Sequence, residues 1–177
     1  MTNYRRAHTP GATWFFTVNI ARRDTALLTQ HIALLRQAVQ RVRRKHPFTI
    51  DAMVVLPDHL HAVWTLPPGD AGYAMRWRQL KGWLSRHVPA GEHRSASRVA
   101  KSERGIWQRR YWEHLVRDED DLQRHVDYIH FNPVKHGYVD KAVDWPYSTV
   151  HRYVARGWLA TDWGGVADSA MEVGERR

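Results

Sequence analysis

Apolar residues alternate along the chain between short runs of aromatic and β-branched residues and longer stretches with helical spacing. The short runs predict β-strands, because such side chains favour a pleated sheet. We expect strands at 12–20, 48–56 and 59–66, and a fourth near 111–116. Only Pro57-Asp58 separates the second run from the third, which predicts an antiparallel hairpin.

The longer stretches carry apolar residues three or four positions apart, which predicts helices. We expect one from Asp24 or Thr25 to Lys45, a second opening at Asp70, and a third starting at Asp118. Pro133 disfavours helical geometry at the residue before it, so the third helix is expected to end at about Asn132.

The expected order of elements is β-α-β-β-α-β-α, which is typical of an α+β, ferredoxin-like split βαβ fold, an antiparallel sheet with its helices on one face. We expect one domain over 1–163, with Trp145, Tyr147, Tyr153 and Trp158 anchoring its last segment. Residues 1–11 form a basic arm, 88–105 a mobile loop of glycine, serine and charge, and 164–177 a loose tail.

Composition narrows the classes of function. The 177 residues include 27 Lys and Arg against 18 Asp and Glu, a formal charge of +9, and no cysteine. A disulfide scaffold, a thiolate metal site and a cysteine nucleophile are therefore excluded. No apolar run is long enough for a membrane span, and the polar start is no secretory signal, so we expect a cytoplasmic protein. The basic excess points to a polyanion such as nucleic acid, although charge also serves solubility.

Two short patterns carry candidate chemistry. His59 and His61 are two apart on an expected strand and therefore point to the same face. Tyr128 and Asn132 are four apart on an expected helix and share a face. Each pattern alone is more simply a pair of surface histidines, or a boundary tyrosine with a capping asparagine. Together they are the parts of a metal-assisted phosphoryl transfer.

In that interpretation two imidazoles and an amide oxygen hold the metal, and the tyrosine hydroxyl attacks phosphorus. A phenol ordinarily ionises near pH 10, so it needs help at neutral pH. His125, one turn earlier, and a metal-bound water are both candidates for the base. We expect Mg²⁺ in cells, with Mn²⁺ active as well, because imidazole suits Mn²⁺ better.

With these motifs the sequence resembles the REP-associated tyrosine transposases, a branch of the single-tyrosine HUH transposase family. The matching stretches are 4–19, 52–67, 75–84, 106–139 and 144–158. The resemblance places the histidine-hydrophobic-histidine motif on His59, Leu60 and His61, and the nucleophile on Tyr128. It places the third ligand on Asn132, where related insertion-sequence transposases commonly have glutamine.

The resemblance also implies a substrate and a product. Members of the family act on single-stranded DNA at the foot of a short palindromic hairpin with a conserved tetranucleotide. They form a 5′-phosphotyrosine link, leave a free 3′-OH, and need no ATP for strand transfer. The resemblance to REP-associated members implies a monomer, so we expect a monomer, with a dimer as the alternative.

Basic residues gather near these positions in the sequence and predict contacts to DNA. They are Arg5, Arg6, Arg76, Arg78, Lys81, Arg109, Arg110, Arg117, Arg124, Lys135 and His136. Interleaved tryptophans, Trp83 and Trp107 among them, are candidates for base stacking. If about six phosphates are contacted, log affinity falls against log salt with a slope near −4 for single strands and −5 for duplex.

Other functions compete with this one. A hairpin-binding protein with vestigial catalysis would keep affinity and form no covalent adduct. A replication initiator or relaxase of the wider HUH superfamily usually belongs to a longer chain. An RNA-binding ferredoxin-like domain would carry an aromatic, glycine-rich signature that is missing from this sequence.

Overall fold

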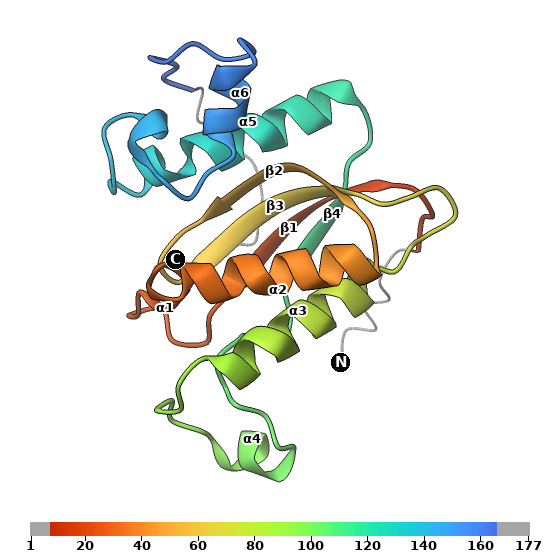
Figure 1. Cartoon of the computed structure of the whole chain (residues 1–177), viewed down its shortest axis with the longest axis vertical. Helices are drawn as coiled ribbons and strands as arrows, with labels where there is room; N and C mark the ends of the chain where they lie inside the picture. Colours follow the sequence, from red (N-terminus) through yellow and green to blue (C-terminus); the bar gives the residue numbers. More distant parts are fainter. Residues whose placement is uncertain (1–7, 166–177) are drawn as a thin grey trace.

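Four antiparallel strands form the sheet in the computed structural model, which describes residues 8–165 (Figure 1). In spatial order they are β2 (Thr49–Val55), β3 (His59–Thr65), β1 (Thr13–Asn19) and β4 (Trp112–Leu115). Every neighbouring pair is antiparallel, and β2 and β3 form the expected hairpin. The strand positions and the split βαβ fold are therefore confirmed.

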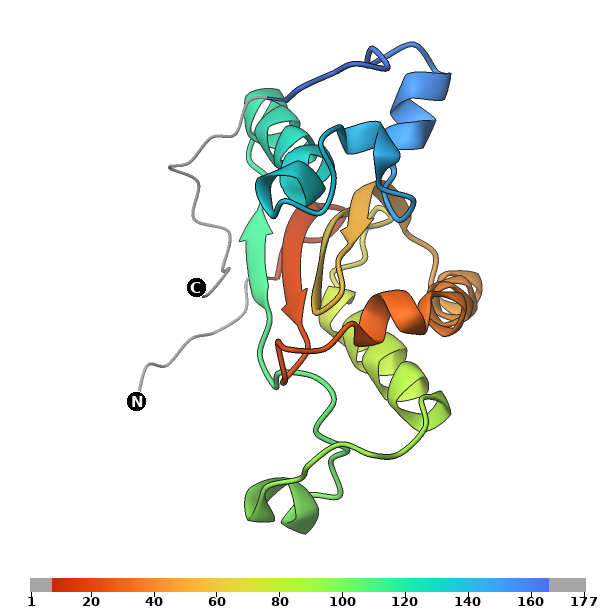
Figure 2. The same ribbon diagram turned by 90° about the vertical axis from the view of Figure 1, so that its left-hand side faces the viewer.

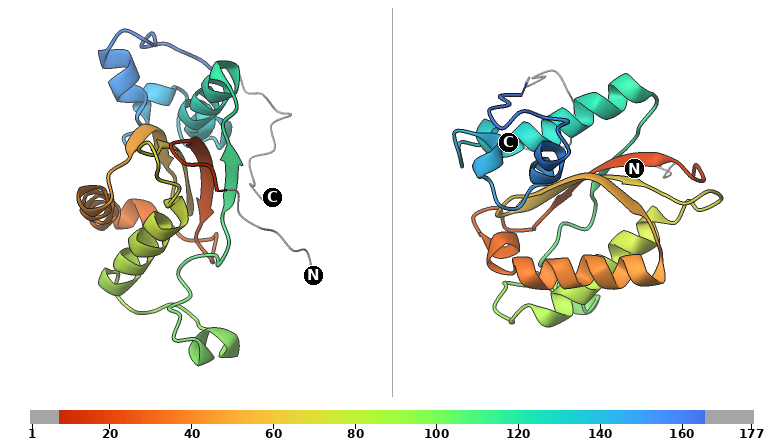
Figure 3. Two further views of the ribbon diagram at one scale, coloured as in Figure 1. Left: turned by 90° about the vertical axis from the view of Figure 1, so that its right-hand side faces the viewer. Right: turned by 45° about the horizontal axis from the view of Figure 1, so that its top comes forward.

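Helices cover both faces of this sheet, so the expectation of helices on one face is wrong. One face carries α1 (Leu27–Gln30), α2 (Ile32–Lys45) and α3 (Tyr73–His87). The other carries α5 (Glu119–Lys135), η1 (Ala142–Asp144) and α6 (Val150–Ala155) (Figures 1 and 3).

The alternating side chains of the central strands explain the two layers. Phe16 and Leu60 pack against α2 and α3, whereas Phe15, one position from Phe16, and Val63, three positions from Leu60, pack against α5. Both faces of β1 and β3 are apolar, so each face needs a helical cover.

The first two helices begin later than the sequence predicted. The first is split at His31, and Asp24 forms an ion pair with Arg22 instead of capping it. The second helix begins at Tyr73. The Asp70 carboxylate accepts a hydrogen bond from the Gly72 amide and forms an ion pair with Arg76, which holds the chain in a turn before the helix.

The third helix continues past the residue at which it was expected to end. α5 starts as predicted, with the Asp118 side chain accepting a hydrogen bond from the Asp121 amide, but it includes Pro133 and ends at Lys135. Proline costs one backbone hydrogen bond inside a helix. The buried Ile129 and Pro133 hold this part of the helix in the fold, so tertiary packing outweighs the local preference.

The segment between α3 and β4 is more ordered than its composition predicted. It contains α4 (Ala96–Ala100) and projects away from the sheet (Figure 2). The Arg104 guanidinium pairs with Glu92 and donates to the carbonyl of Val88, which ties the segment to the end of α3. The expectation that 88–105 is a loop without regular structure is therefore wrong. The mobility of this segment stays a prediction.

The segment after α5 packs on the edge strand β2. Trp145 donates from Nε1 to the Val55 carbonyl at 2.9 Å, and Tyr153 donates to the Asp51 carbonyl at 3.0 Å. Trp158 is 59% exposed and contacts Tyr153 edge-on, so it contributes little burial to this segment. Most of the expected basic arm and tail lies outside the described residues. Within 8–165, no helix has the length and apolar character that crossing a membrane requires.

Candidate active site

Strand β3 buries two histidines on the face that α5 covers. The side chains of His59 and His61 are 1% and 0% exposed, and their ring centroids lie 5.0 Å apart. Because residues two apart on a strand share a face, the apolar Leu60 between them points into the opposite layer. The predicted histidine pair is therefore brought together inside the protein and not on an exposed surface.

Each imidazole is oriented by a hydrogen bond at Nδ1. His59 Nδ1 lies 2.7 Å from the Asp58 carboxylate, and His61 Nδ1 lies 2.8 Å from Thr17 Oγ1. A metal would therefore be held through Nε2 of each ring, the arrangement in which a second protein group fixes the orientation of a ligating histidine.

Asp58 is itself held as a carboxylate. Burial alone would raise its pKa, but hydrogen bonds from His59 and Arg23 outweigh burial and lower the pKa to about 2. The Arg23 guanidinium lies 2.7 Å from the second carboxylate oxygen. An ionised Asp58 accepts the Nδ1 proton of His59, which leaves the lone pair of that ring on Nε2.

Helix α5 carries the predicted tyrosine and asparagine, and it brings the tyrosine against the histidine pair. The Tyr128 ring stands edge-on to His61, with centroids 5.3 Å apart, and only 5% of Tyr128 is exposed. Asn132, one turn later on the same helical face, is fully buried. His136, just beyond the helix, lies 5.2 Å from His59 between ring centroids.

The donor set fits a divalent cation. Two imidazoles whose Nδ1 atoms are already hydrogen-bonded, with one amide oxygen, suit Mn²⁺ and later metals, and Mg²⁺ less well. Three protein ligands also leave coordination positions for phosphate oxygens, which a catalytic ion requires.

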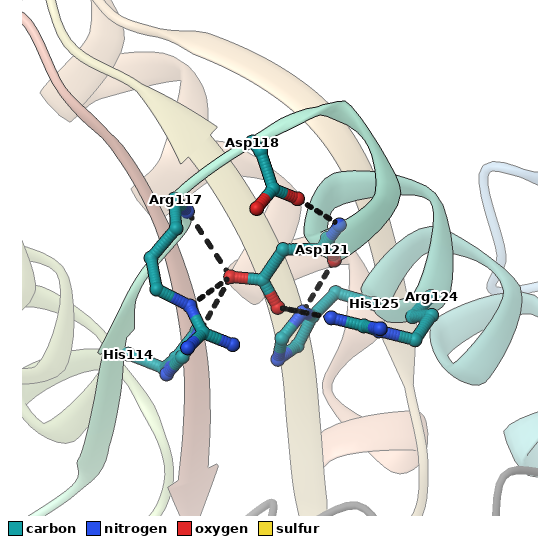
Figure 4. Close-up of polar contacts among 6 residues, drawn as sticks. All are labelled: His114, Arg117, Asp118, Asp121, Arg124 and His125. Atoms are coloured by element: carbon teal, nitrogen blue, oxygen red, sulfur yellow. Dashed lines mark hydrogen bonds and ion pairs between the residues drawn. The ribbon is translucent and has the colours of Figure 1, made fainter.

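A second histidine group lies at the start of α5, and sequence reasoning did not foresee it. Figure 4 shows the Asp121 carboxylate between His114 and His125, whose potential ligand atoms all lie within 4.8 Å of one another. His114 comes from β4, seven residues before Asp121, so sequence spacing gave no signal; the pairing of the edge strand with β1 brings them together.

The Asp121 carboxylate is already saturated with donors. It accepts from His114 Nε2 at 2.8 Å and from the Arg117 amide at 3.0 Å. The guanidiniums of Arg117 and Arg124 lie 3.3 and 3.5 Å away. Burial would raise the Asp121 pKa, but these hydrogen bonds hold it well below its usual range. A cation here would face two arginines, so we interpret this group as structural.

His125 is the predicted candidate base, and its ring belongs to this second group. Burial lowers its pKa, partly offset by the hydrogen bond that its Nδ1 donates to the Asp121 carbonyl at 2.7 Å. The ring is therefore neutral at pH 7. It packs on Phe15, with centroids 4.5 Å apart, and Phe15 in turn contacts the rings of His61 and Tyr128.

The predicted DNA contacts fall into separate places. Arg78, Arg109, Arg110, Arg117, Arg124, Lys135 and His136 are exposed. Arg78, Lys81 and Arg109 line one pocket between α3 and the segment that carries α4, whereas Arg124 and Lys135 belong to α5. Helix α3 packs on the opposite face of the sheet from α5 (Figure 3). Arg5 and Arg6 lie outside the described residues.

Three expected nucleic-acid contacts are wrong or weakened. Arg76 is 1% exposed and is bound by Asp70 and by the carbonyls of His46 and Pro47, so it is a core ion pair and no DNA contact. Lys81 is half-buried and donates to the Gln108 carbonyl at 2.7 Å. Trp107 is only 6% exposed, which leaves Trp83, stacked on His87, as the freer of the two stacking candidates.

Several known proteins are similar to this chain over most of its length. A family model described as "Transposase IS200 like" matches residues 15–132. The REP-associated tyrosine transposase of Escherichia coli K12 is 46% identical over 99% of this chain and 98% of its own length. A putative REP-associated tyrosine transposase of Haemophilus influenzae is 44% identical, covering 95% of this chain and 96% of its own length.

A solved structure is similar over the whole fold. It is described as a REP-associated tyrosine transposase bound to a REP hairpin, and it superposes with a TM-score of 0.86 at 45% identity. The match covers all of this chain and 99% of the other.

Proposed function

The chain belongs to the family of IS200-like transposases, and from that premise we propose that it binds REP-type palindromic hairpins in single-stranded DNA and cleaves and rejoins one strand through Tyr128. The observation that carries this proposal is the contact between Tyr128 and His61, 5.3 Å between ring centroids, which sets a phenol beside a buried histidine pair.

In the cleavage step the Tyr128 hydroxyl oxygen attacks phosphorus. The Oη–P bond forms, the bond from phosphorus to the 3′ oxygen breaks, and a 5′-phosphotyrosine and a free 3′-OH result. In the joining step a 3′-OH attacks the phosphotyrosine and Tyr128 leaves. The phosphotyrosine link conserves the energy of the broken phosphodiester bond, so neither step needs ATP.

His59, His61 and Asn132 are the residues that would hold the divalent metal of this reaction. Bound there, the ion would supply Lewis-acid stabilisation of charge on the phosphate oxygens. We assign it to this group and not to His114, Asp121 and His125, because the Asp121 carboxylate is occupied by Arg117 and Arg124. Mg²⁺ in cells, with Mn²⁺ active in its place, remains our proposal for its identity.

The phenolic proton must leave as the bond forms. His125 is a candidate to receive it, because its ring is neutral and lies one helical turn before Tyr128. Exposed arginines at the start of α5, Arg117 and Arg124, would meet the phosphates of the substrate. We propose that the protein acts as a monomer on DNA in the cytoplasm.

The test is a covalent adduct on a REP-type hairpin oligonucleotide with single-stranded flanks, incubated with Mn²⁺ and resolved under denaturing conditions. We expect the wild type to form the adduct and Tyr128→Phe to form none, because phenylalanine lacks the attacking oxygen. Chelation of the metal should also abolish the adduct while hairpin binding, measured by fluorescence anisotropy, persists.

Tyr138→Phe is the matched control. It removes the same hydroxyl from a tyrosine on the same side of the fold that is 44% exposed, and we expect full adduct formation. An adduct with Tyr128→Phe would show that another residue is the nucleophile. Hairpin binding without any wild-type adduct would favour the alternative, a binding protein with vestigial catalysis.

A further inference from the structure

Lys135 contacts the oxygen that we propose to attack DNA. Its Nζ donates a hydrogen bond to Tyr128 Oη over 2.9 Å, and the same ammonium lies 4.6 Å from the centroid of the Tyr128 ring. Lys135 is exposed, whereas Tyr128 is 5% exposed. The lysine therefore reaches from the solvent-facing end of α5 back to a buried phenol.

The helix geometry explains why these two side chains meet. Tyr128 and Lys135 are seven residues apart, two turns along the same face of α5. Side chains on a helix lean toward its N-terminus, so the long lysine stem points back toward the tyrosine. The contact depends on the helix continuing through Pro133, beyond the point at which the sequence predicted its end.

We propose that Lys135 is a catalytic residue that stabilises negative charge on Tyr128 Oη in both strand cleavage and strand joining. This role rests on the proposed function of Tyr128 as the nucleophile. A lysine ammonium has three donors and no acceptor, so it can stabilise a phenolate but cannot take the phenolic proton. A charged donor aimed at a developing oxyanion favours the transition state over the ground state.

The role is the same in both directions. In cleavage the phenolic proton passes to a base or to solvent, Oη gains a bond to phosphorus, and the departing 3′ oxygen takes up a proton. In joining, the Oη–P bond breaks and the electron pair returns to Oη, where the ammonium meets it. Lys135 keeps its own protons throughout.

Two simpler roles would leave a different experimental signature. Sequence reasoning assigned Lys135 to a DNA phosphate, which predicts a loss of affinity and a shallower salt dependence when the charge is removed. A cation at a helix C-terminus also stabilises the helix dipole, which predicts a loss of stability alone. Neither role predicts a slower chemical step on DNA that is already bound.

The experiment measures single-turnover adduct formation by the full-length protein at saturating hairpin oligonucleotide with Mn²⁺. Lys135→Met removes the charge and keeps the length of the stem. We expect its rate to fall on the order of 10- to 100-fold, as for the loss of one donor to a reacting oxygen. Hairpin affinity should stay within about twofold and the salt slope unchanged. Lys135→Arg, which keeps the charge, should recover part of the rate.

Lys141→Met is the matched control, because it removes one exposed lysine charge six residues later. We expect it to react at the wild-type rate. A wild-type rate for Lys135→Met at saturating DNA overturns the proposal, and so does a loss confined to affinity with the salt slope reduced by about 0.7. An adduct with Tyr128→Phe would instead overturn the proposed function, so the two failures are distinguishable.

Discussion

Two groups of histidines lie along helix α5, and they differ in what surrounds them. At the C-terminal half of the helix, the His61 ring contacts Tyr128, the His59 ring contacts His136, and Asn132 is buried. At its N-terminal end, His114 and His125 face the carboxylate of Asp121 (Figure 4). By residue type the second group, with its carboxylate, is the better match to a common metal site.

The surroundings reverse that ranking. The only carboxylate of the second group accepts hydrogen bonds or ion pairs from His114, Arg117 and Arg124, so its negative charge is already neutralised. In the first group, Nδ1 of His59 is hydrogen-bonded to Asp58 and Nδ1 of His61 to Thr17. A metal would therefore be held through Nε2 of each ring. We therefore propose that the metal binds at the first group, where hydrogen bonds orient the imidazoles and no pair of arginines neutralises a ligand.

The largest expected effect separates the two groups by activity. His61→Ala should slow Mn²⁺-dependent adduct formation by about 100-fold or more, because a catalytic metal contributes several kcal/mol to the transition state. His114→Ala removes the same imidazole from the other group and should change the rate by less than about threefold. The reverse result would place the catalytic metal at Asp121.

A smaller effect tests the structural role of the second group. Asp121→Asn should lower the free energy of unfolding by about 2 kcal/mol, because it removes the buried charge that balances Arg117, Arg124 and His114. Asp120→Asn, an exposed neighbour in the same helical turn, should cost less than about 0.5 kcal/mol. Urea denaturation measures both. Equal stability of the two variants would contradict a structural role for Asp121.

The smallest effect is on the dependence of stability on pH. Burial lowers the pKa of His125, so between that lowered value and about 6.5 the unfolded chain binds a proton that the folded chain does not. Stability from this group is therefore present above about pH 6.5 and is lost as the pH falls. His125→Gln should reduce the loss between pH 6.5 and 5 by about 1 kcal/mol.

The matched control is His93→Gln, an exposed histidine in the segment that carries α4, which should leave the pH dependence as in the wild type. Denaturant midpoints at several pH values measure the difference. An unchanged slope for His125→Gln would show that His125 is protonated equally in both states.

Much of the fold could be predicted from the sequence because its signals are local. The strands follow aromatic and β-branched runs, and Asp118 marks the start of α5 through its own side chain. The pairing of His59 with His61 follows from the alternation of a strand alone, since residues two apart share a face wherever the strand lies. Their burial under α5 agrees with the apolar character of that strand.

The errors have a common origin in long-range packing. Arg76 was expected at the surface, but Asp70 and two backbone carbonyls bind it in the interior. Helices were expected on one face of the sheet, but both faces of β1 and β3 are apolar. The local spacing of residues predicts neither the burial of a charged side chain nor the face of the sheet on which a helix packs.

By itself the sequence determined the order of the elements, the histidine pair, and the helical spacing of Tyr128 and Asn132, because each depends only on backbone periodicity. Tertiary structure decided that His61 is buried against Tyr128, and that α5 continues through Pro133 so that Lys135 reaches Tyr128. The physical reason is that the burial of α5 side chains against the sheet outweighs the local cost of a proline. No local sequence pattern predicts how much of the helix is buried.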